Sequence, residues 1–323
     1  MAAMRICSFV PSATEMLFAL GLGDQVVGVS HECDYPPEVT AKPRVTTGLI
    51  DPERLSSAEI DTAVSEAVRA GSPLYEVDLD LLRRLQPDLI VTQDLCNVCA
   101  VEGNHVREAT TLLDPRPRLV SLQPSSLREM VDGIWALAEA AGVASRAVGL
   151  ANDLQNRIEA LREKSARLDR PSTLCLEWLD PAWIAGHWMP EIVELAGGEQ
   201  VLARAGTPSI RAPWADIAAA APEVVIVMPC GFDVERTLQE VRGLDSIPQF
   251  RQLPAFRSGR VYVVDGSAYF NRAGPRLVEG AELLARLLHP DVFPGEVDPQ
   301  AALQLASAAG RKRLAFEPIT GAG

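Results

Sequence analysis

The sequence is poor in the features that mark several common protein classes. It contains no run of about 18 apolar residues, the length that a membrane-spanning helix requires. Its six cysteines are too sparse for a disulfide scaffold. The 30 Lys and Arg residues are outnumbered by 43 Asp and Glu residues, which gives a formal net charge of −13. Such an acidic chain repels phosphate backbones, so neither membrane insertion nor a nucleic-acid partner is expected.

Motifs that signal common enzymes are also missing. No Gly-x-Ser-x-Gly, His-Glu-x-x-His or phosphate-loop pattern occurs. Thiols are the only nucleophile candidates, so the sequence favours a protein that is not an enzyme. At the N-terminus a lone Arg5 precedes a short apolar run that Pro11 ends, which is no secretory signal. As written, the chain is expected in the cytoplasm; if a leader has been removed, it would be periplasmic or at the cell surface.

Alternating strand and helix signals predict an α/β protein. Short apolar runs at 5–9, 26–29, 89–92 and 118–120 read as buried strands, and Ser-x-x-Glu capping boxes at Ser12 and Ser56 precede helical segments. The stretch 144–168 has no proline and carries apolar residues at helical spacing, which predicts one long helix. We therefore predict two α/β lobes joined by a single long helix, with these divisions: lobe 1–143, linking helix 144–170, lobe 171–290 and tail 291–323.

A weak internal repeat supports the two lobes. The segment 85–91 (LQPDLIV) resembles the segment 221–227 (APEVVIV), each with a proline, an acid and a buried strand. Parallel strands need crossover helices, and their ligands bind beyond the carboxyl ends of the strands. The loops that follow the predicted strands are therefore the candidate site.

Aromatic side chains gather in these loops. They make up only 5% of the chain, yet three of the five Trp residues (Trp178, Trp188 and Trp214) fall in the loops. A wide, flat and partly apolar ligand needs such rigid faces together with a few orienting polar groups. The predicted ligand-binding residues are Tyr35, Trp178, Trp188, Trp214, Phe232, Tyr269, Phe270, Arg272 and Arg276.

The order and spacing of several motifs resemble the class III substrate-binding proteins of ABC importers, which bind cobalamin, siderophores or haem. The resemblance covers about residues 4–290. It rests on the segments 8–15 (SFVPSATE), 28–30 (GVS), 34–37 (DYPP), 85–91 (LQPDLIV), 144–168 and 268–276 (AYFNRAGPR). It implies two α/β lobes joined by one backbone helix, with a ligand cleft between them.

Within this class the chain looks most similar to the cobalamin binders. The resemblance implies a corrinoid ligand, cobalamin or a precursor, and cleft roles for Tyr35, Trp214 after Pro213, and Arg272. It further implies a monomer that docks on an importer permease through one acid per lobe, here Asp80 and Asp216. Residues 56–77 are an insertion relative to the family, and this departure leaves a cytoplasmic storage or trafficking role open.

Two smaller groups of residues leave alternatives open. Cys96 and Cys99 precede His105, and with Cys33 or His31 they could bind zinc, act as a redox dithiol, or be ordinary thiols. His31 and His187 could each supply an axial cobalt ligand or form ordinary hydrogen bonds. The alternative functions are therefore a metal, haem or siderophore binder, and a thiol oxidoreductase or corrinoid-processing enzyme using Cys96 and Cys99.

Overall fold

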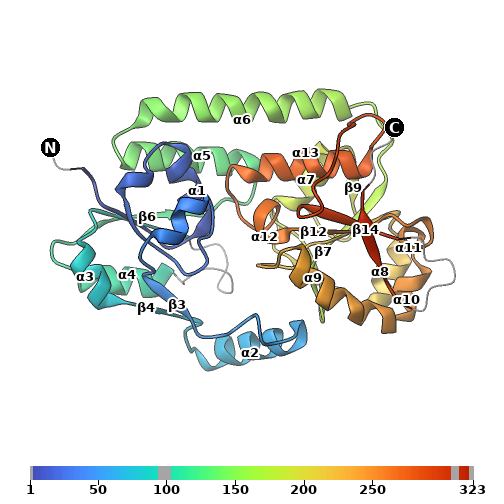
Figure 1. Ribbon diagram of the computed structural model, residues 1–323, viewed down its shortest axis with the longest axis horizontal. Helices are drawn as coiled ribbons and strands as arrows, with labels where there is room; N and C mark the ends of the chain where they lie inside the picture. The colour runs from blue at the N-terminus through green and yellow to red at the C-terminus, as the bar shows by residue number, and fades with distance from the viewer. Residues whose placement is uncertain (1–2, 94–102, 307–312, 320–323) are drawn as a thin grey trace.

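The computed structural model describes residues 3–93, 103–306 and 313–319. Two lobes lie side by side beneath one long helix, α6 (Figure 1). Among the described residues, no helix combines the length and apolar character needed to cross a membrane. The predicted α/β architecture is confirmed.

The first lobe is built around a parallel four-stranded sheet. Its strands follow the order β2 (Val26–Val29), β1 (Ile6–Ser8), β5 (Leu89–Gln93) and β6 (Arg118–Leu122). Its helices are α1 (Pro11–Ala19), α3 (Leu79–Leu85), α4 (Gly103–Thr111) and α5 (Leu127–Ala140). Strands β3 (Thr46–Gly48) and β4 (Tyr75–Val77) form a separate antiparallel pair. A further helix, α2 (Ser57–Ala70), lies between them in the sequence. Helix α2 lies away from this sheet, beneath the gap between the lobes (Figure 1).

The second lobe contains a mixed sheet. Its order is β10 (Ile210–Arg211), β8 (Ala182–Ile184), β7 (Ser172–Leu179), β11 (Val224–Val227), β12 (Val261–Val264), β13 (Ala302–Leu305) and β14 (Phe316–Pro318), with β9 (Glu199–Gln200) also on β7. Strands β7, β11 and β12 are parallel. The helices are α7 (Met189–Leu195), α8 (Trp214–Ala220), α9 (Val234–Glu240), α10 (Pro248–Gln252), α11 (Pro254–Ser258), α12 (Gly266–Tyr269) and α13 (Arg276–Leu288).

The segment predicted as a tail belongs to this sheet. Strand β13 pairs antiparallel with β12, and β14 continues the sheet beyond it. Ala302 and Leu305 are buried because they cover the edge that β12 would otherwise expose. The Pro- and Gly-rich composition after residue 290 concealed these strands, so the second lobe extends to β14.

The internal repeat corresponds to a shared local structure. Gln86 and Ala221 end α3 and α8 with φ angles of 43° and 46°, the left-handed conformation that stops a helix. The acids that follow then bind the start of the neighbouring strand. Asp88 accepts from the backbone N–H of Arg5 at 2.8 Å, and Glu223 accepts from that of Ser172 at 2.9 Å.

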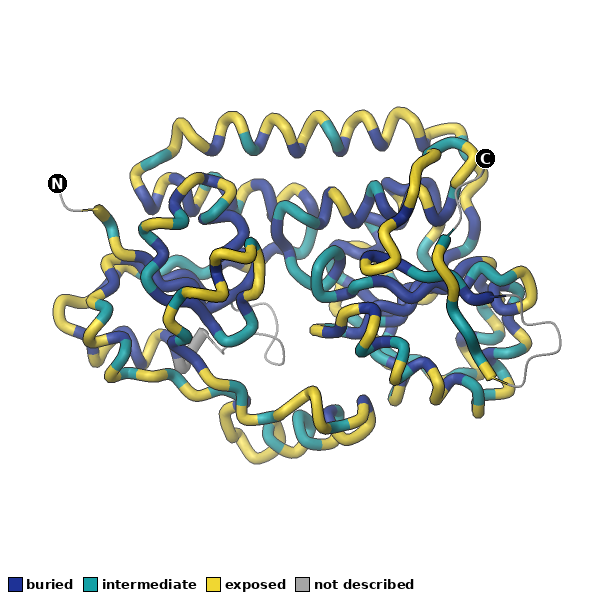
Figure 2. The backbone as a smooth tube through the Cα atoms, viewed as in Figure 1, coloured by how far each residue is buried: buried dark blue, intermediate teal, exposed yellow. Residues whose placement is uncertain are grey.

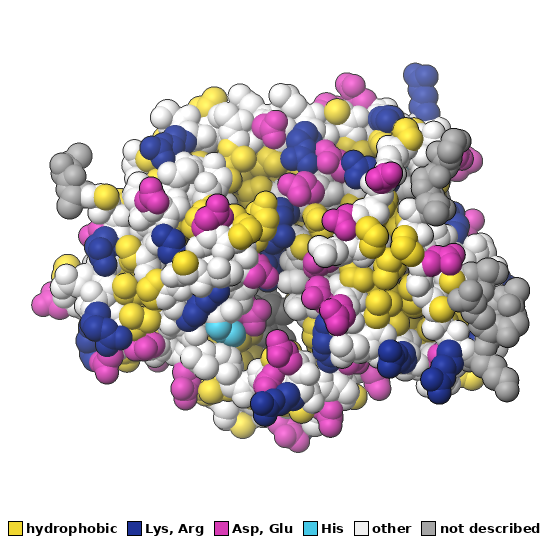
Figure 3. All heavy atoms as spheres, in the orientation of Figure 1, with side chains coloured by type: hydrophobic (Ala, Val, Ile, Leu, Met, Phe, Trp, Pro, Cys, Tyr) yellow, Lys and Arg dark blue, Asp and Glu magenta, His cyan; other side chains and the backbone are white. Residues whose placement is uncertain are grey.

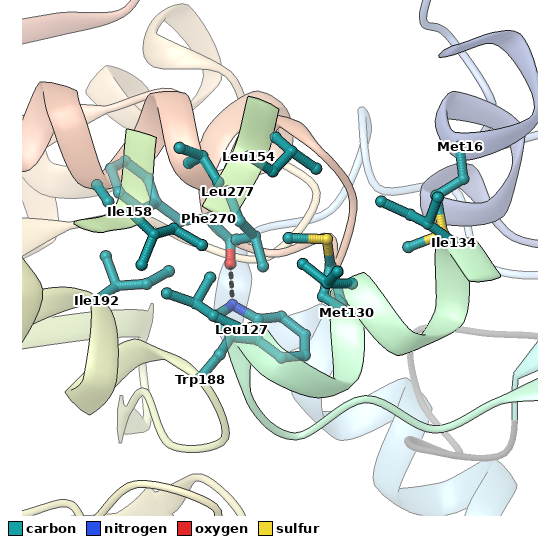
Figure 4. Close-up of a cluster of buried hydrophobic side chains, with 14 of the residues drawn as sticks. Met16, Leu127, Met130, Ile134, Leu154, Ile158, Trp188, Ile192, Phe270 and Leu277 are labelled. Carbon is teal, nitrogen blue, oxygen red and sulfur yellow. Dashed lines mark hydrogen bonds between the residues drawn. The ribbon is translucent and has the colours of Figure 1, made fainter. Parts of the chain in front are cut away.

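One apolar core runs through both lobes beneath α6 (Ala144–Ser165). Its 22 residues span roughly 33 Å at 1.5 Å per residue, and they bury Ala147, Ala151, Leu154, Ile158 and Leu161 along one face. Figure 4 shows side chains of α5, α6, α7 and α13 meeting in this core. Figure 2 shows the outward face of α6 exposed and its inward face buried. The lobes are therefore fused on the α6 side, and no cleft separates them there.

The two Ser-x-x-Glu motifs behave differently. Ser56 and Glu59 form the predicted capping box at the start of α2. The predicted box at Ser12 is absent, because α1 begins at Pro11 and has no side-chain cap. The acid of that motif, Glu15, instead turns toward the second lobe and pairs with Arg276.

Candidate functional site

A cavity of about 670 Å³ lies between the lobes. Figure 3 shows the surface hollowed there, above the segment that contains α2. The lining residues come from the segments that follow β2, β11 and β12, including α9, α12 and the first residue of α13, and from the segment before α2. They are Asp34, Tyr35, Pro52, Glu53, Gly231, Phe232, Asp233, Glu235, Arg236, Gln239, Asp265, Ser267, Ala268 and Arg276. The carboxyl ends of parallel strands therefore meet at this cavity, as such sheets require.

The cavity lining is acidic. Five carboxylates face two guanidinium groups among the lining residues. Asp233 and Asp265 also cap short helices by accepting from the backbone N–H groups of Arg236 and Ala268. Asp34 is paired with Arg272. The remaining lining acids are Glu53 and Glu235, and they leave the wall with an excess of negative charge.

Two arginines join the lobes at the inner end of the cavity. Arg272 binds both carboxylate oxygens of Asp34, and its Nη2 donates to the carbonyl of Glu32 at 3.2 Å. Arg276 donates to both oxygens of Glu15, from Nη2 at 2.7 Å and from Nε at 3.1 Å. Bidentate pairs of this kind fix geometry as well as charge. They hold the first lobe's β2 loop and α1 against the loop that follows β12.

The Glu15 carboxylate is the most buried charge in this group. Its side chain is 3% exposed, and the side chain of Arg276 is 12% exposed. Burial raises the pKa of Glu15 above its usual value, while the hydrogen bonds and charge of Arg276 act in the opposite direction. Because a buried carboxylate needs its partner, the pair ties the two lobes together.

Tyr35 and Phe232 supply aromatic surface on opposite lobes. The Arg276 guanidinium lies 4.0 Å from the centroid of the Tyr35 ring, and Tyr35 is still 42% exposed. Phe232 is 3% exposed and is packed by Arg236 at 4.4 Å and by Trp178 at 5.3 Å between ring centroids. The Tyr35 ring is therefore the larger free aromatic face on the cavity.

Other predicted ligand contacts lie elsewhere. Trp188 is 8% exposed, and its Nε1 donates to the carbonyl of Phe270 at 2.7 Å inside the shared core (Figure 4). Phe270 is 1% exposed, and Tyr269 packs against the same core. Trp214 packs edge-on against Phe250, with ring centroids 5.9 Å apart. These rings follow strands in the sequence, but their bulk is used to fill the cores.

The two histidines are partly engaged within the protein. His31 Nδ1 lies 2.8 Å from the Thr46 hydroxyl, and its Nε2 lies 3.3 Å from a Glu32 carboxylate oxygen. His187 has a φ of 51° and lies beside Trp188, with ring centroids 5.8 Å apart. Neither is among the residues that line the cavity. An axial role for either would require a rearrangement.

The half-buried His187 side chain should make the stability of the protein depend on pH. Burial lowers the pKa of His187 below its usual value of 6.5, so the unfolded state binds more protons as the pH falls. Stability should therefore fall as the pH drops below about 6.5. We expect His187→Asn, which tolerates a positive φ, to lose less thermal stability than the parent between about pH 7 and pH 5.5. Thermal melts across this range test it, and equal losses in both proteins would contradict it.

The predicted cysteine site cannot be placed. Cys96 and Cys99 lie outside the described residues, and so does the side chain of His105 in α4. Cys33, one of the two candidates for the fourth ligand, is buried and contacts the hydroxyls of Ser30 and Thr14. Within the described ranges, no three His, Cys, Asp or Glu side chains gather as a metal site.

The predicted docking acids lie at the surface of each lobe. Asp80 is in the first turn of α3, has a side chain that is 79% exposed, and pairs with Arg83. Asp216 is exposed in the first turn of α8. Both are accessible to a partner.

Sequence and structure comparisons agree with this architecture. The family model described as "Periplasmic binding protein" matches residues 6–268. A vitamin B12-binding protein of Vibrio cholerae is 24% identical over 289 residues, which cover 88% of this chain and 89% of that protein. The solved periplasmic vitamin B12-binding protein BtuF of Vibrio cholerae has a TM-score of 0.66, with 21% identity, 91% of this chain and 99% of that chain covered.

A haem binder is equally similar in structure. The periplasmic heme-binding protein RhuT from Roseiflexus sp. RS-1 has a TM-score of 0.66, with 25% identity, 90% of this chain and 100% of that chain covered. The chain belongs to the periplasmic binding protein family. A relative from Bacillus subtilis, 23% identical over 296 residues, is named as a substrate-binding lipoprotein of an ABC transporter. The relatives named above are binding proteins. The predicted cytoplasmic location finds no support among these periplasmic proteins.

Proposed function

We propose that this protein binds a corrinoid, cobalamin or one of its precursors, in the cavity between its lobes. The cavity volume of about 670 Å³ falls within the range of small-molecule sites. Tyr35 offers a broad ring on the first lobe, and Phe232 contributes from the second. The similarity to vitamin B12-binding proteins over most of the chain supports the same ligand class.

The negative charge of the cavity lining is the observation that favours a corrinoid over haem. Corrin rings bear primary amides, whose N–H groups can donate to carboxylates such as Glu53 and Glu235. Haem carries two propionates, and bringing these beside an acidic wall would cost energy through like-charge repulsion and desolvation. The excess of carboxylates therefore favours an amide-bearing ligand over an anionic one.

Haem, or a siderophore, is the second candidate. The similarity to a haem-binding protein favours it, and Arg236 and Arg276 could each pair with a carboxylate of such a ligand. A zinc ion at Cys96 and Cys99, or a thiol-dependent activity of this pair, has no support from the binding-protein relatives.

The partner would be an importer permease. Asp80 and Asp216 are exposed on different lobes, where a permease could pair each with a basic residue. In that role the protein acts as a monomer in the periplasm or at the cell surface. Retention in a cytoplasmic fraction, with no effect of its deletion on corrinoid uptake, would contradict this part of the proposal.

An equilibrium ligand screen tests the proposed function. We expect cobalamin or cobinamide to bind more tightly than haem, as followed by tryptophan fluorescence and absorbance. Tyr35→Leu should weaken corrinoid binding about tenfold, because it removes the exposed ring, whereas Tyr35→Phe should retain affinity. Preference for haem, or equal affinity in both variants, would contradict the assignment.

A further inference from the structure

Helix α2 and the turn before it reach across to the second lobe. We call residues 51–70 the strap. They leave the first lobe after β3 and return to it at β4, and in between they lie beneath the gap between the lobes (Figure 1). The cavity lies above them, and Pro52 and Glu53 of the strap line it.

A group of second-lobe side chains holds the start of the strap helix. The Glu240 carboxylate accepts from the backbone N–H of Ser57 at 3.1 Å and from the Ser57 hydroxyl. Trp178 Nε1 donates to the Ser57 carbonyl at 3.1 Å. Arg236 Nη2 donates to the Leu55 carbonyl at 2.7 Å, and its Nη1 binds Glu240 at 2.5 Å. We call Trp178, Arg236 and Glu240 the latch.

The latch charges are well shielded. The side chains of Arg236 and Glu240 are 18% and 15% exposed. Burial alone would raise the pKa of Glu240, but hydrogen bonds from Ser57 and Arg236 lower it below its usual value. Glu240 is therefore held as a carboxylate at the positive end of the α2 helix dipole, where an anion is stabilised.

A second attachment lies one turn further along the strap. Arg211 Nη2 contacts both oxygens of Asp61 at 2.8 Å, and the Asp61 side chain is 20% exposed. Arg211 also stacks on Trp183, with 5.0 Å from the guanidinium carbon to the ring centroid. Two separate sites on the second lobe thus hold one helix that belongs to the first.

Apolar packing contributes little to the position of the strap. Of the 14 residues of α2, only Ser57 and Ile60 are buried. Ile60 belongs to none of the three apolar clusters formed by the described residues. A segment with few buried apolar contacts opens at a lower free energy than the core around it. Its closed position depends mainly on the polar latch and on the pair of Arg211 with Asp61.

We propose that the strap is a cover over the mouth of the ligand cavity, and that release of the latch limits ligand entry and exit. This inference rests on the proposed binding function. On the α6 side the lobes are fused by a continuous core, which closes that side of the cavity to the ligand, and the strap lies on the opposite side. A cover that is closed in both the free and the bound protein slows association and dissociation together. Glu53, the strap acid proposed to contact the ligand, lies in the turn before α2, where its backbone N–H donates to Asp51 at 3.1 Å, and not at the latch. Release of the latch should therefore change the affinity less than it changes the rates.

The test compares Glu240→Ala with the matched control Glu282→Ala. Glu282 also forms a bidentate pair, with Arg157 of α6, but it lies away from the strap. Stopped-flow measurements with cobalamin should show both rate constants raised about tenfold or more in Glu240→Ala, because charged hydrogen bonds are lost. The dissociation constant should change less than about threefold, and Glu282→Ala should keep the parent rates. Unchanged rates in Glu240→Ala would overturn the proposal.

Hydrogen exchange separates this proposal from the ligand assignment. Without any ligand, backbone amides of residues 57–70 should exchange faster in Glu240→Ala than in the parent and in Glu282→Ala. Equal exchange in the three proteins would overturn the latch whether or not cobalamin binds. If the parent fails to bind cobalamin, the corrinoid assignment is lost, and the same rate comparison with haem as the probe decides the role of the strap.

Discussion

Replacing Arg276 by methionine is expected to lower the free energy of unfolding by about 3–5 kcal/mol, the usual effect of leaving one buried charge without its partner. The Glu15 carboxylate would remain 3% exposed with its bidentate partner gone. Arg272, whose Nη1 lies 3.9 Å from Glu15, would compensate only in part because it already binds Asp34. Denaturant unfolding measures the change.

The matched control is Arg157→Met. Arg157 and Glu282 form an equally bidentate pair between α6 and α13, with both distances 2.9 Å, but their side chains are 30% and 33% exposed. Solvent screening limits such a pair to about 1 kcal/mol or less. The double variant Glu15→Gln/Arg276→Met should recover part of the loss, because no charge is left buried. Equal losses in Arg276→Met and Arg157→Met would contradict the role given to Glu15.

Trp188→Ala is expected to cost about 3–5 kcal/mol of stability, the range for removing a buried aromatic side chain. The indole fills the core shared by α5, α6 and α7, and it donates to the Phe270 carbonyl (Figure 4). Its removal leaves both a void and an unpaired carbonyl. Since Trp188 does not line the cavity, corrinoid affinity of the folded variant should stay near that of the parent.

Tyr35→Leu should have the opposite effects to Trp188→Ala. Tyr35 is 42% exposed on the cavity, so its loss should weaken binding while changing stability by less than about 1 kcal/mol. Denaturant melts and ligand titrations of both variants would separate the two roles. A Trp188→Ala protein with unchanged stability and lost binding would contradict the structural placement of this ring.

Much of the fold could be read from the sequence because it is encoded locally. Buried strands appear as short apolar runs, and the long helix appears as an unbroken helical pattern that ends near the predicted residue. The Pro-acid motif marks the same left-handed helix end in both lobes. Strands β13 and β14 were missed because their stability comes from the free edge of β12, about 40 residues earlier in the chain.

The site was less accessible to sequence reasoning. Ligands of parallel sheets bind at the carboxyl ends of the strands. This rule pointed to the segments around Tyr35, Phe232 and Arg276, and these three residues line the cavity. The same rule did not reveal which aromatic side chain in a loop faces the cavity and which faces the core. Trp188, for example, follows a strand but lies in the shared core. Glu15 was hidden because Ser-x-x-Glu reads as a helix cap. The contact of Ser57 with Glu240 joins residues 183 positions apart, for which a single sequence holds no signal.

The shared core also limits how the protein moves. Side chains from α5, α6, α7 and α13 interlock across the lobe boundary, and a rigid packed interface does not deform continuously. Ligand exchange should therefore depend on a local opening at the strap more than on a wide hinge motion. This links the proposed cover to α6, the long helix that packs on the core shared by both lobes.

A crystal structure of the protein with cobalamin is the most direct test of a corrinoid site between the lobes. We expect the corrin ring beside Tyr35, with ring amides within hydrogen-bond distance of Glu53 or Glu235. Cobalamin bound on an outer surface, or a crystal grown at saturating cobalamin whose inter-lobe cavity holds only solvent, would contradict the account.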